Sequence, residues 1–293
     1  MSHIVSYVKR QRENTFLDVE FNEVDALVLS QFVYLKFGNA IPTISENKRP
    51  VYLYELADSI DYDKVFVDER YRKDNIELFE AMADSKRFRR MQINYHSDIT
   101  SVLAQTQFSA MTVFLEDGPQ VVIFRGTDET MVGWKEDFNM CFKEPVTGQS
   151  LSALYLQQIS DLIEGKFIVM GHSKGGNFAV YASMNVQDEI QNRIEKVYSF
   201  DSPGFRPEIL ESVDFNKIKD KICKYLPHSS IFGMLLQSKE KYQVVECFSV
   251  GVFQHNPYKW QIFGTEFKKI DKLDKGSIFL NETFLLALIS RYV

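Results

Sequence analysis

The stretch that decides the fold is Phe167-Ile168-Val169-Met170-Gly171-His172-Ser173-Lys174-Gly175-Gly176-Asn177-Phe178-Ala179-Val180-Tyr181. Four apolar residues lead into Gly171, which predicts a buried strand, and after Gly176 the apolar spacing becomes helical. Between them lies the pattern G-x-S-x-G, with Ser173 at its centre. A Cβ at Gly171 or Gly175 would collide across so sharp a turn. The stretch therefore predicts a strand, a tight turn that presents a serine, and a helix.

A serine in this position is typical of a nucleophile elbow, the strand–turn–helix motif of α/β-hydrolases. The helix that begins at Lys174 points its positive end toward an oxyanion formed beside the serine. The alternative is a glycine-rich turn with an incidental serine. A serine hydroxyl is a weak nucleophile unless a base takes its proton, and an acid must orient that base. The rest of the chain must therefore supply a histidine, an acid and a second oxyanion donor.

Length and composition fit one large α/β domain. The chain has 293 residues, of which 45% are hydrophobic and 25% charged, so a substantial core can form. Its net charge is −6, with Lys and Arg interspersed among acids, so no basic field attracts nucleic acid. Three dispersed cysteines, Cys141, Cys223 and Cys247, are too few for a disulfide framework or a metal site. They predict a reduced protein in the cytoplasm that needs no metal or cofactor.

Neither a signal peptide nor a membrane span is expected. Residues 1–9 lack a long apolar core. No apolar run reaches the length of about 18 residues that a transmembrane helix needs. Peripheral membrane contact stays open, and the sequence does not determine the oligomeric state.

Residues 1–90 are interpreted as a helical extension packed on the main domain. Residues 1–15 are polar and basic, which is typical of a surface arm, and residues 38–71 are irregular. A helix is predicted over Phe21–Phe37 with Asn22 as its N-cap, and a shorter one over Asn75–Ala83. The basic run Arg87–Arg90 is interpreted as a solvated helix end.

Strands and helices alternate after this extension. The predicted helices lie at 129–142 and 149–163, and the predicted strands are Met91–Tyr95, Thr106–Leu115, Gln120–Phe124, Lys196–Phe200, Lys221–Leu226 and Tyr242–Val250. The turn Asp117-Gly118-Pro119 makes a hairpin of the second and third strands. The strand-like runs after the elbow alternate with helical or loop segments, which favours a parallel sheet. The predicted fold class is α/β: an α/β-hydrolase in a single domain over 1–293, with a mostly parallel central sheet flanked by helices.

The acid and the base are expected on loops after successive strands, in the order serine, acid, histidine. Asp201 directly follows the strand after the elbow, and His255 follows the last strand. His228 is the alternative base, and Asp214 and Glu246 are the alternative acids. His172 neighbours Ser173 in sequence, so its side chain should point elsewhere and serve as a packed or hydrogen-bonded support.

Two donors are expected for the oxyanion. One is the backbone N–H of Lys174, the residue after the nucleophile. The other is Thr127, which follows the strand over 121–124 in Arg125-Gly126-Thr127-Asp128. Alternatively, Thr127 or Asp128 caps the next helix. Arg125 is expected to form a structural ion pair with Glu136 or Asp137.

The apolar run Ile231-Phe232-Gly233-Met234-Leu235-Leu236 lies in a loop position beside His228. It is interpreted as a lid or an acyl-chain wall, with Phe232, Met234 and Leu235 as substrate contacts. The alternative is a buried amphipathic helix.

These motifs carry a family resemblance. Phe124-Arg125-Gly126-Thr127, with Trp134 and Asp137 downstream and then Gly-His-Ser-x-Gly-Gly, resembles the class-three (fungal triacylglycerol) lipases, which implies that Thr127 is an oxyanion donor. The chain is also similar, over almost its whole length, to the bacterial Mbeg-like family of lipase-like proteins. The matching stretches are 21–27, 124–140, 171–177, 197–201 and 254–260. The resemblance implies an α/β-hydrolase fold.

Two positions depart from the lipase pattern. Class-three lipases carry their acid after the penultimate strand, where this chain has His228-Ser229-Ser230, so Asp201 instead resembles the pancreatic-lipase arrangement. Lys174 replaces an apolar residue, and it is interpreted as a solvated surface lysine or as a cation that attracts an anionic head group.

The predicted function is a serine hydrolase that cleaves carboxylic esters or thioesters, with lipid-like acyl substrates, through an acyl-enzyme on Ser173. Acyltransferases and peptidases share this mechanism and differ in the acceptor. The alternative is a catalytically silent hydrolase fold that serves as a binding or membrane-associated module.

Overall fold

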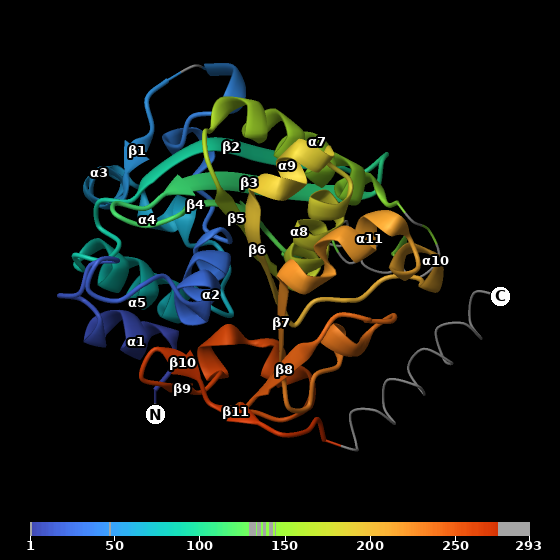
Figure 1. The fold of residues 1–293 in the computed structure, drawn as a ribbon. Coiled ribbons are helices and arrows are strands. Elements are labelled where there is room, and N and C mark those ends of the chain that lie inside the picture. The colour runs from blue at the N-terminus through green and yellow to red at the C-terminus, as the bar shows by residue number, and fades with distance from the viewer. Residues whose placement is uncertain are drawn as a thin grey trace.

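A mixed nine-stranded sheet forms the centre of the protein (Figure 1). The computed structural model describes residues 2–46, 48–128 and 145–274, together with Gly133, Glu136, Asn139, Met140 and Lys143. In spatial order the strands are β1 Val51–Tyr52, β2 Gln92–Ser101, β3 Thr106–Phe114, β4 Gln120–Phe124, β5 Phe167–His172, β6 Ile194–Phe200, β7 Ile222–Pro227, β8 Tyr242–Val245 and β11 Lys269–Ile270. Strands β4 to β8 run parallel, and β1 to β4 pair antiparallel.

Helices cover both faces of this sheet. The parallel strands follow one another in spatial order, so right-handed crossovers put their connecting helices on the same face. These helices are α7 Thr147–Leu162, α8 Lys174–Met184, α9 Asp188–Arg193, α10 Pro207–Leu210 and α11 Val213–Ile218. Figure 1 shows the N-terminal helices on the other side: α1 Ile4–Arg10, α2 Glu23–Phe32, α3 Leu53–Ser59, α4 Tyr62–Val65 and α5 Arg72–Ala83.

The alternation of side chains along each strand supplies two cores. In β5, Val169 packs toward α7 and α8, whereas Ile168 and Met170 pack toward the N-terminal helices. In β6, Val197 packs in the same core as Val169, and Tyr198 packs in the same core as Ile168 and Met170. Because a strand's side chains alternate between faces and both faces are covered, these strands read as continuous apolar runs. The protein is therefore an α/β fold with a mixed, largely parallel central sheet flanked by helices, as the sequence predicts.

The prediction of an N-terminal surface arm is wrong. Residues 4–10 form helix α1, and Ile4, Tyr7 and Val8 are fully buried. The Tyr7 hydroxyl donates a hydrogen bond of 2.9 Å to Asp25 in α2. The basic residues at the end of α1 face outward, whereas its apolar positions pack against α2 and α5, so composition alone concealed a core helix.

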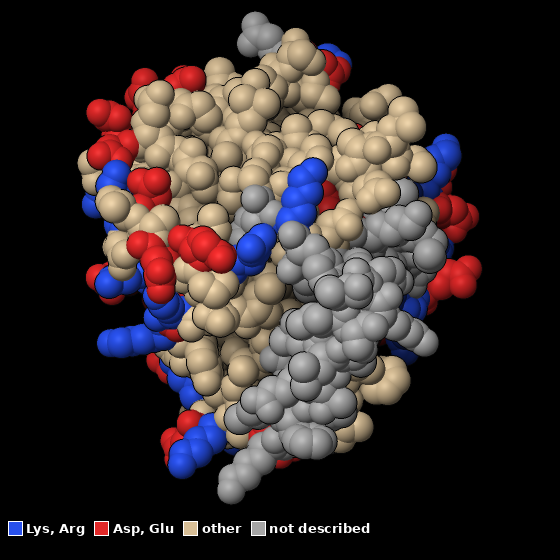
Figure 2. Space-filling model, turned by 90° about the vertical axis from the view of Figure 1, so that its right-hand side faces the viewer, with Lys and Arg blue, Asp and Glu red and all other residues tan. Residues whose placement is uncertain are grey.

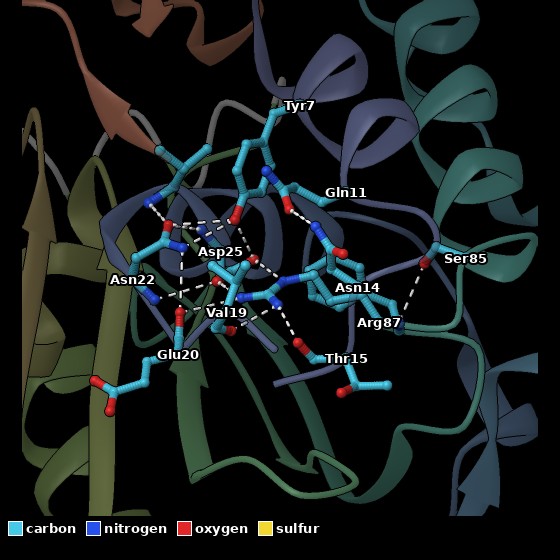
Figure 3. Close-up of polar contacts among 12 residues, drawn as sticks. Tyr7, Gln11, Asn14, Thr15, Val19, Glu20, Asn22, Asp25, Ser85 and Arg87 are labelled. Atoms are coloured by element: carbon cyan, nitrogen blue, oxygen red, sulfur yellow. Dashed lines mark hydrogen bonds and ion pairs between the residues drawn. The ribbon is translucent and has the colours of Figure 1, made fainter. Parts of the chain in front are cut away.

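A second correction concerns Arg87, which is not at a solvated helix end. Its guanidinium donates to Asp25 Oδ1 at 2.8 Å, and both side chains are fully buried (Figure 3). It also donates to the carbonyl oxygens of Thr15 and Val19. Asp25 closes the capping box of α2 with Asn22, the predicted N-cap. This network ties the chain before α2 to the turn that follows α5. Helix α2 ends at Phe32 instead of the predicted Phe37.

Other element boundaries differ in length. Strand β2 continues to Ser101, beyond the predicted Tyr95, and β8 ends at Val245, short of the predicted Val250. Most of the helix predicted over 129–142 lies outside the described residues, as do Trp134, Asp137 and Cys141. Among the helices that the structure describes, none is both long and apolar enough to cross a bilayer. Figure 2 shows basic and acidic side chains mixed on the surface rather than gathered by sign.

Candidate active site

Ser173 occupies a strained turn between β5 and α8. Its backbone φ is 57° and ψ is −134°, a conformation that residues with a Cβ rarely adopt. A Cβ on Gly171 would lie 2.3 Å from the carbonyl carbon of Gly175, and one on Gly175 would lie 2.2 Å from the carbonyl oxygen of Phe124. The Ser173 N–H donates to the Phe200 carbonyl at 2.8 Å. Backbone strain held by such close packing is typical of a functional site and presents the serine at the end of the sheet.

Asp201 and His255 are brought together by the fold. Asp201 follows β6, and His255 ends the 3-10 helix η5 Gly251–His255. His255 Nδ1 lies 2.6 Å from Asp201 Oδ2. The Asp201 side chain is buried, and its other oxygen accepts hydrogen bonds from Gly233 N at 3.1 Å and from the Ser230 hydroxyl. Residues of the loop after β7 therefore hold the acid in place, although His228-Ser229-Ser230, directly after the strand, carries no carboxylate.

This contact favours one tautomer of His255. With its Nδ1–H donated to the carboxylate, the neutral ring has an unprotonated Nε2 that can accept a proton. The His255 ring packs against two other rings, those of Phe232 and His172, with centroids 4.3 Å and 4.5 Å away. These contacts restrict its rotation.

His172 has the supporting position that its sequence context predicts. Its Nε2 lies 3.0 Å from the backbone carbonyl of His255, to which it donates. Its Nδ1 then accepts from the Tyr34 hydroxyl at 3.3 Å. Burial lowers the pKa of His172 well below the ordinary value, which keeps this ring neutral.

The rival residues have other partners. His228 Nδ1 lies 3.3 Å from Cys247 N, and its Nε2 lies 2.9 Å from the Gln254 side-chain amide. Glu246 pairs with Lys268 at 2.5 Å, and Asp214 pairs with Lys217 on the surface at 3.4 Å.

The loop after β4 lies directly against the elbow. A Cβ on Gly126 would lie 2.6 Å from the His172 carbonyl oxygen and 3.1 Å from Ser173 Cβ. Only glycine allows so close an approach, and it brings Thr127 to the cavity that Ser173 lines. Arg125 forms an ion pair with Asp98, in which its guanidinium makes two contacts of 3.0 Å. Of the two predicted partners, Asp137 lies outside the described residues.

These residues surround a cavity of about 500 Å³. Ser173, His255, Thr127 and Phe232 line it. The other lining residues come from the N-terminal layer, from the ends of the segments that carry Thr127 and Ser173, and from both sides of His255: Gln31, Tyr34, Asp68, Arg70, Tyr71, Asp128, His172, Ser249, Val252, Phe253, Asn256, Pro257 and Lys259. The run 231–236 forms a three-residue 3-10 turn, Phe232–Met234, and not an amphipathic helix. Met234 and Leu235 are half-buried on that turn, and they are not among the described residues that line the cavity.

Both interpretations of the Lys174 side chain are wrong. It is buried, and its ammonium lies 2.8 Å from Glu136 Oε2. It is therefore neither solvated nor available to a head group. Sequence spacing gives no sign of this, because the two residues belong to separate elements and only the folded chain brings them together.

The described residues contain no cluster of three or more His, Cys, Asp or Glu side chains suited to a metal ion. Cys223 is half-buried, Cys247 is buried, and both are free thiols.

Comparison with known proteins identifies the family. The Mbeg1-like family matches residues 82–289, and the chain belongs to this family. No curated protein matches the chain.

Several solved lipase structures are similar to this chain. A fungal lipase in complex with an inhibitor shares 14% identity over 76% of this chain and 78% of its own, with a TM-score of 0.45. M37 lipase shares 16% identity over 73% and 69% of the two chains, with a TM-score of 0.45. The Rhizomucor miehei lipase–propeptide complex shares 14% identity over 64% and 72%, with a TM-score of 0.41. At these identities the similarity concerns the fold alone.

Proposed function

We propose that this member of the Mbeg1-like family is a serine hydrolase that cleaves carboxylic esters or thioesters of lipid-like acyl substrates. The contact of 2.6 Å between Asp201 and His255 carries the proposal. It supports an oriented base on the same cavity as a serine held in a strained turn.

The reaction has two halves. Ser173 Oγ attacks the carbonyl carbon while His255 Nε2 takes the hydroxyl proton. The bond from that carbon to the leaving oxygen or sulfur then breaks, and His255 gives its proton to the departing alcohol or thiol. In the second half, water attacks the acyl-enzyme, His255 takes the proton of the water, and Ser173 recovers it as the acid product leaves.

Charge develops at two places along this path. The tetrahedral oxyanion is stabilised by the backbone N–H of Lys174 and by Thr127, and α8 contributes the positive end of its dipole. The imidazolium of His255 is stabilised by Asp201, whose buried carboxylate is held by Gly233 N and Ser230. Because these donors are fixed before reaction, little reorganisation is needed in the transition state.

The walls of the cavity support an apolar acyl group. Phe232, Val252 and Phe253 line it, and Phe232 also packs on the base. Met234 and Leu235 follow Phe232 in the chain, and we propose that they contact a longer acyl chain that extends past Phe232. Val252 and Phe253 are exposed, which supports peripheral contact with a lipid surface.

The alternative of a silent module rests on two features, the absence of a carboxylate from His228-Ser229-Ser230 after the penultimate strand and the unusual Lys174. That loop binds the Asp201 carboxylate through Ser230 and Gly233, and Lys174 has a buried partner in Glu136. Neither feature now argues against catalysis, and the silent module becomes an outcome of the test.

The test is covalent labelling followed by turnover. A fluorophosphonate probe should label the wild-type protein and should not label Ser173→Ala. A series of p-nitrophenyl esters of increasing acyl length then measures hydrolysis, with Ser173→Ala as the control. Labelling that persists in Ser173→Ala removes the nucleophile assignment, and folded wild type without labelling or turnover supports the silent module.

We also propose a cytoplasmic location, which is supported by the free thiols of Cys223 and Cys247. Cell fractionation followed by immunoblotting tests it, and recovery outside the cytoplasmic fraction contradicts it.

A further inference from the structure

A buried ion pair lies beside Ser173 and has no step in the proposed reaction. Lys174 Nζ and Glu136 Oε2 are 2.8 Å apart, and the two side chains are 0% and 1% exposed. The Glu136 carboxylate also accepts hydrogen bonds from Gln107 N at 3.0 Å, from Gly148 N at 2.9 Å and from the Thr106 hydroxyl. This carboxylate therefore joins the start of α8 to β3 and to the first turn of α7.

Stability alone is a weak reason for such a pair. Removing two charges from water is costly, and well-packed apolar residues of similar volume are often as stable or more stable. A buried ion pair does, however, specify a geometry, because the ammonium must meet the carboxylate at one distance and one orientation. The position of this pair therefore deserves a functional explanation.

The pair connects the two proposed oxyanion donors. Lys174 itself carries the first donor on its backbone. From Glu136 the connection passes to Gln107, whose side-chain oxygen accepts from Asp128 N at 3.2 Å. Asp128 directly follows Thr127, the second donor. The chain Lys174–Glu136–Gln107–Asp128 thus spans two segments that are remote in sequence, and Gln107 is itself buried.

We propose that Lys174 and Glu136 are positioning residues that set the spacing of the two oxyanion donors. This inference rests on the proposed hydrolase function. Oxyanion donors must lie about 2.7–3.1 Å from the developing charge. A misplacement of about 1 Å can lower the rate about 100-fold. Loss of the ion pair should therefore lower kcat without weakening substrate binding.

The experiment uses two variants and a matched control. Lys174→Met keeps an unbranched side chain but leaves the Glu136 charge unpaired. Lys174→Met/Glu136→Gln removes both charges and keeps one acceptor oxygen, which can replace Oε1 toward Gly148 N or Oε2 toward Gln107 N. Because it leaves no unpaired buried charge, it remains usable where the single variant fails to fold. The control is Lys224→Met, since Lys224 and Glu240 form another buried pair at 3.0 Å, with side chains 1% and 3% exposed.

The kinetic readout is hydrolysis of a p-nitrophenyl ester, corrected for the folded fraction by circular dichroism. We expect kcat to fall about 100-fold in both Lys174 variants while KM stays within about twofold. Lys224→Met should keep kcat within about twofold of wild type, because its pair lies outside the cavity lining. Lys174 variants with the kcat of the Lys224→Met control overturn the inference and leave the hydrolase assignment intact.

A second readout needs no activity. Hydrogen–deuterium exchange followed by mass spectrometry reports the peptides that cover 121–128 and 171–176. Both peptides should exchange severalfold faster in Lys174→Met/Glu136→Gln than in wild type or Lys224→Met. If wild type shows no Ser173-dependent turnover, the proposed function fails by itself, and exchange decides the structural link. Unchanged exchange in the 121–128 peptide overturns that link.

Discussion

Replacing Asp201 by Asn should abolish most activity through the tautomer of His255. Asp201 Oδ1 accepts from Gly233 N at 3.1 Å and from the Ser230 hydroxyl. In Asp201→Asn the Gly233 N–H holds the amide oxygen where Oδ1 was, because the amide NH₂ would meet this N–H donor to donor. The NH₂ group therefore takes the place of Oδ2, 2.6 Å from His255 Nδ1.

An amide N–H at that place reverses the hydrogen bond. His255 Nδ1 must accept it, so the neutral ring carries its proton on Nε2 and cannot take the proton of Ser173. The loss of this tautomer lowers kcat by about 10⁴-fold in a triad. That factor corresponds to about 5.5 kcal/mol of transition-state stabilisation.

The assay is steady-state hydrolysis of a p-nitrophenyl ester, together with the rate of fluorophosphonate labelling. The matched control is Asp214→Asn, which changes an exposed aspartate in a surface ion pair and should leave kcat unchanged. Asp201→Asn with kcat within about tenfold of wild type would refute the reasoning, since the residual rate expected without a competent triad is far lower.

Three further predictions concern the cavity, the buried histidine and the lipid surface. Phe232→Ala removes a ring that lines the cavity and whose centroid lies 4.3 Å from that of His255. The value of kcat/KM should therefore fall more for long-chain than for short-chain p-nitrophenyl esters. An equal fall for both would contradict the role of Phe232 as an acyl wall. Burial lowers the pKa of His172, so below about pH 6.5 the unfolded chain takes up a proton that the folded protein does not, and the free energy of unfolding should fall with decreasing pH by at most about 1.4 kcal/mol per unit. Urea unfolding at several pH values measures this slope, which should be shallower in His172→Gln; equal slopes would show that His172 does not contribute. Val252→Asp/Phe253→Asp places charges at residues that are 51% and 70% exposed, so it should weaken co-sedimentation of the protein with phospholipid vesicles. The control is Phe263→Asp, at a residue that is 82% exposed and lies outside the cavity lining. Equal vesicle binding by both variants would argue against contact through the cavity rim.

Local patterns were sufficient for much of the fold. Strand β4 has the predicted bounds Gln120–Phe124, and Asn22 caps α2 as predicted, because strand periodicity and helix capping depend on neighbouring residues. The order of serine, acid and histidine along the chain also predicts the pairing of Asp201 with His255, which lie 2.6 Å apart. In a parallel sheet the carboxyl ends of successive strands share an edge, so chain order there predicts proximity.

Pairings between remote segments could not be predicted in this way. Arg87 looked like part of a solvated basic run, and its partner Asp25 lies 62 residues away. Arg125 pairs with Asp98, which lies 27 residues earlier in the chain. Composition describes what a side chain is, whereas burial and pairing depend on which elements pack beside it.

The elbow itself shows both kinds of information. The sequence alone determined that residues 167–181 form a strand, a glycine-dependent turn and a helix with Ser173 at the turn, because those constraints act between residues adjacent in the chain. Only the tertiary structure decided that Lys174 is buried against Glu136, that Phe232 and His172 pack against the His255 ring, and that the loop after β7 holds Asp201. Each of these contacts joins segments far apart in the chain, and its geometry exists only when the sheet and its two helical layers are assembled.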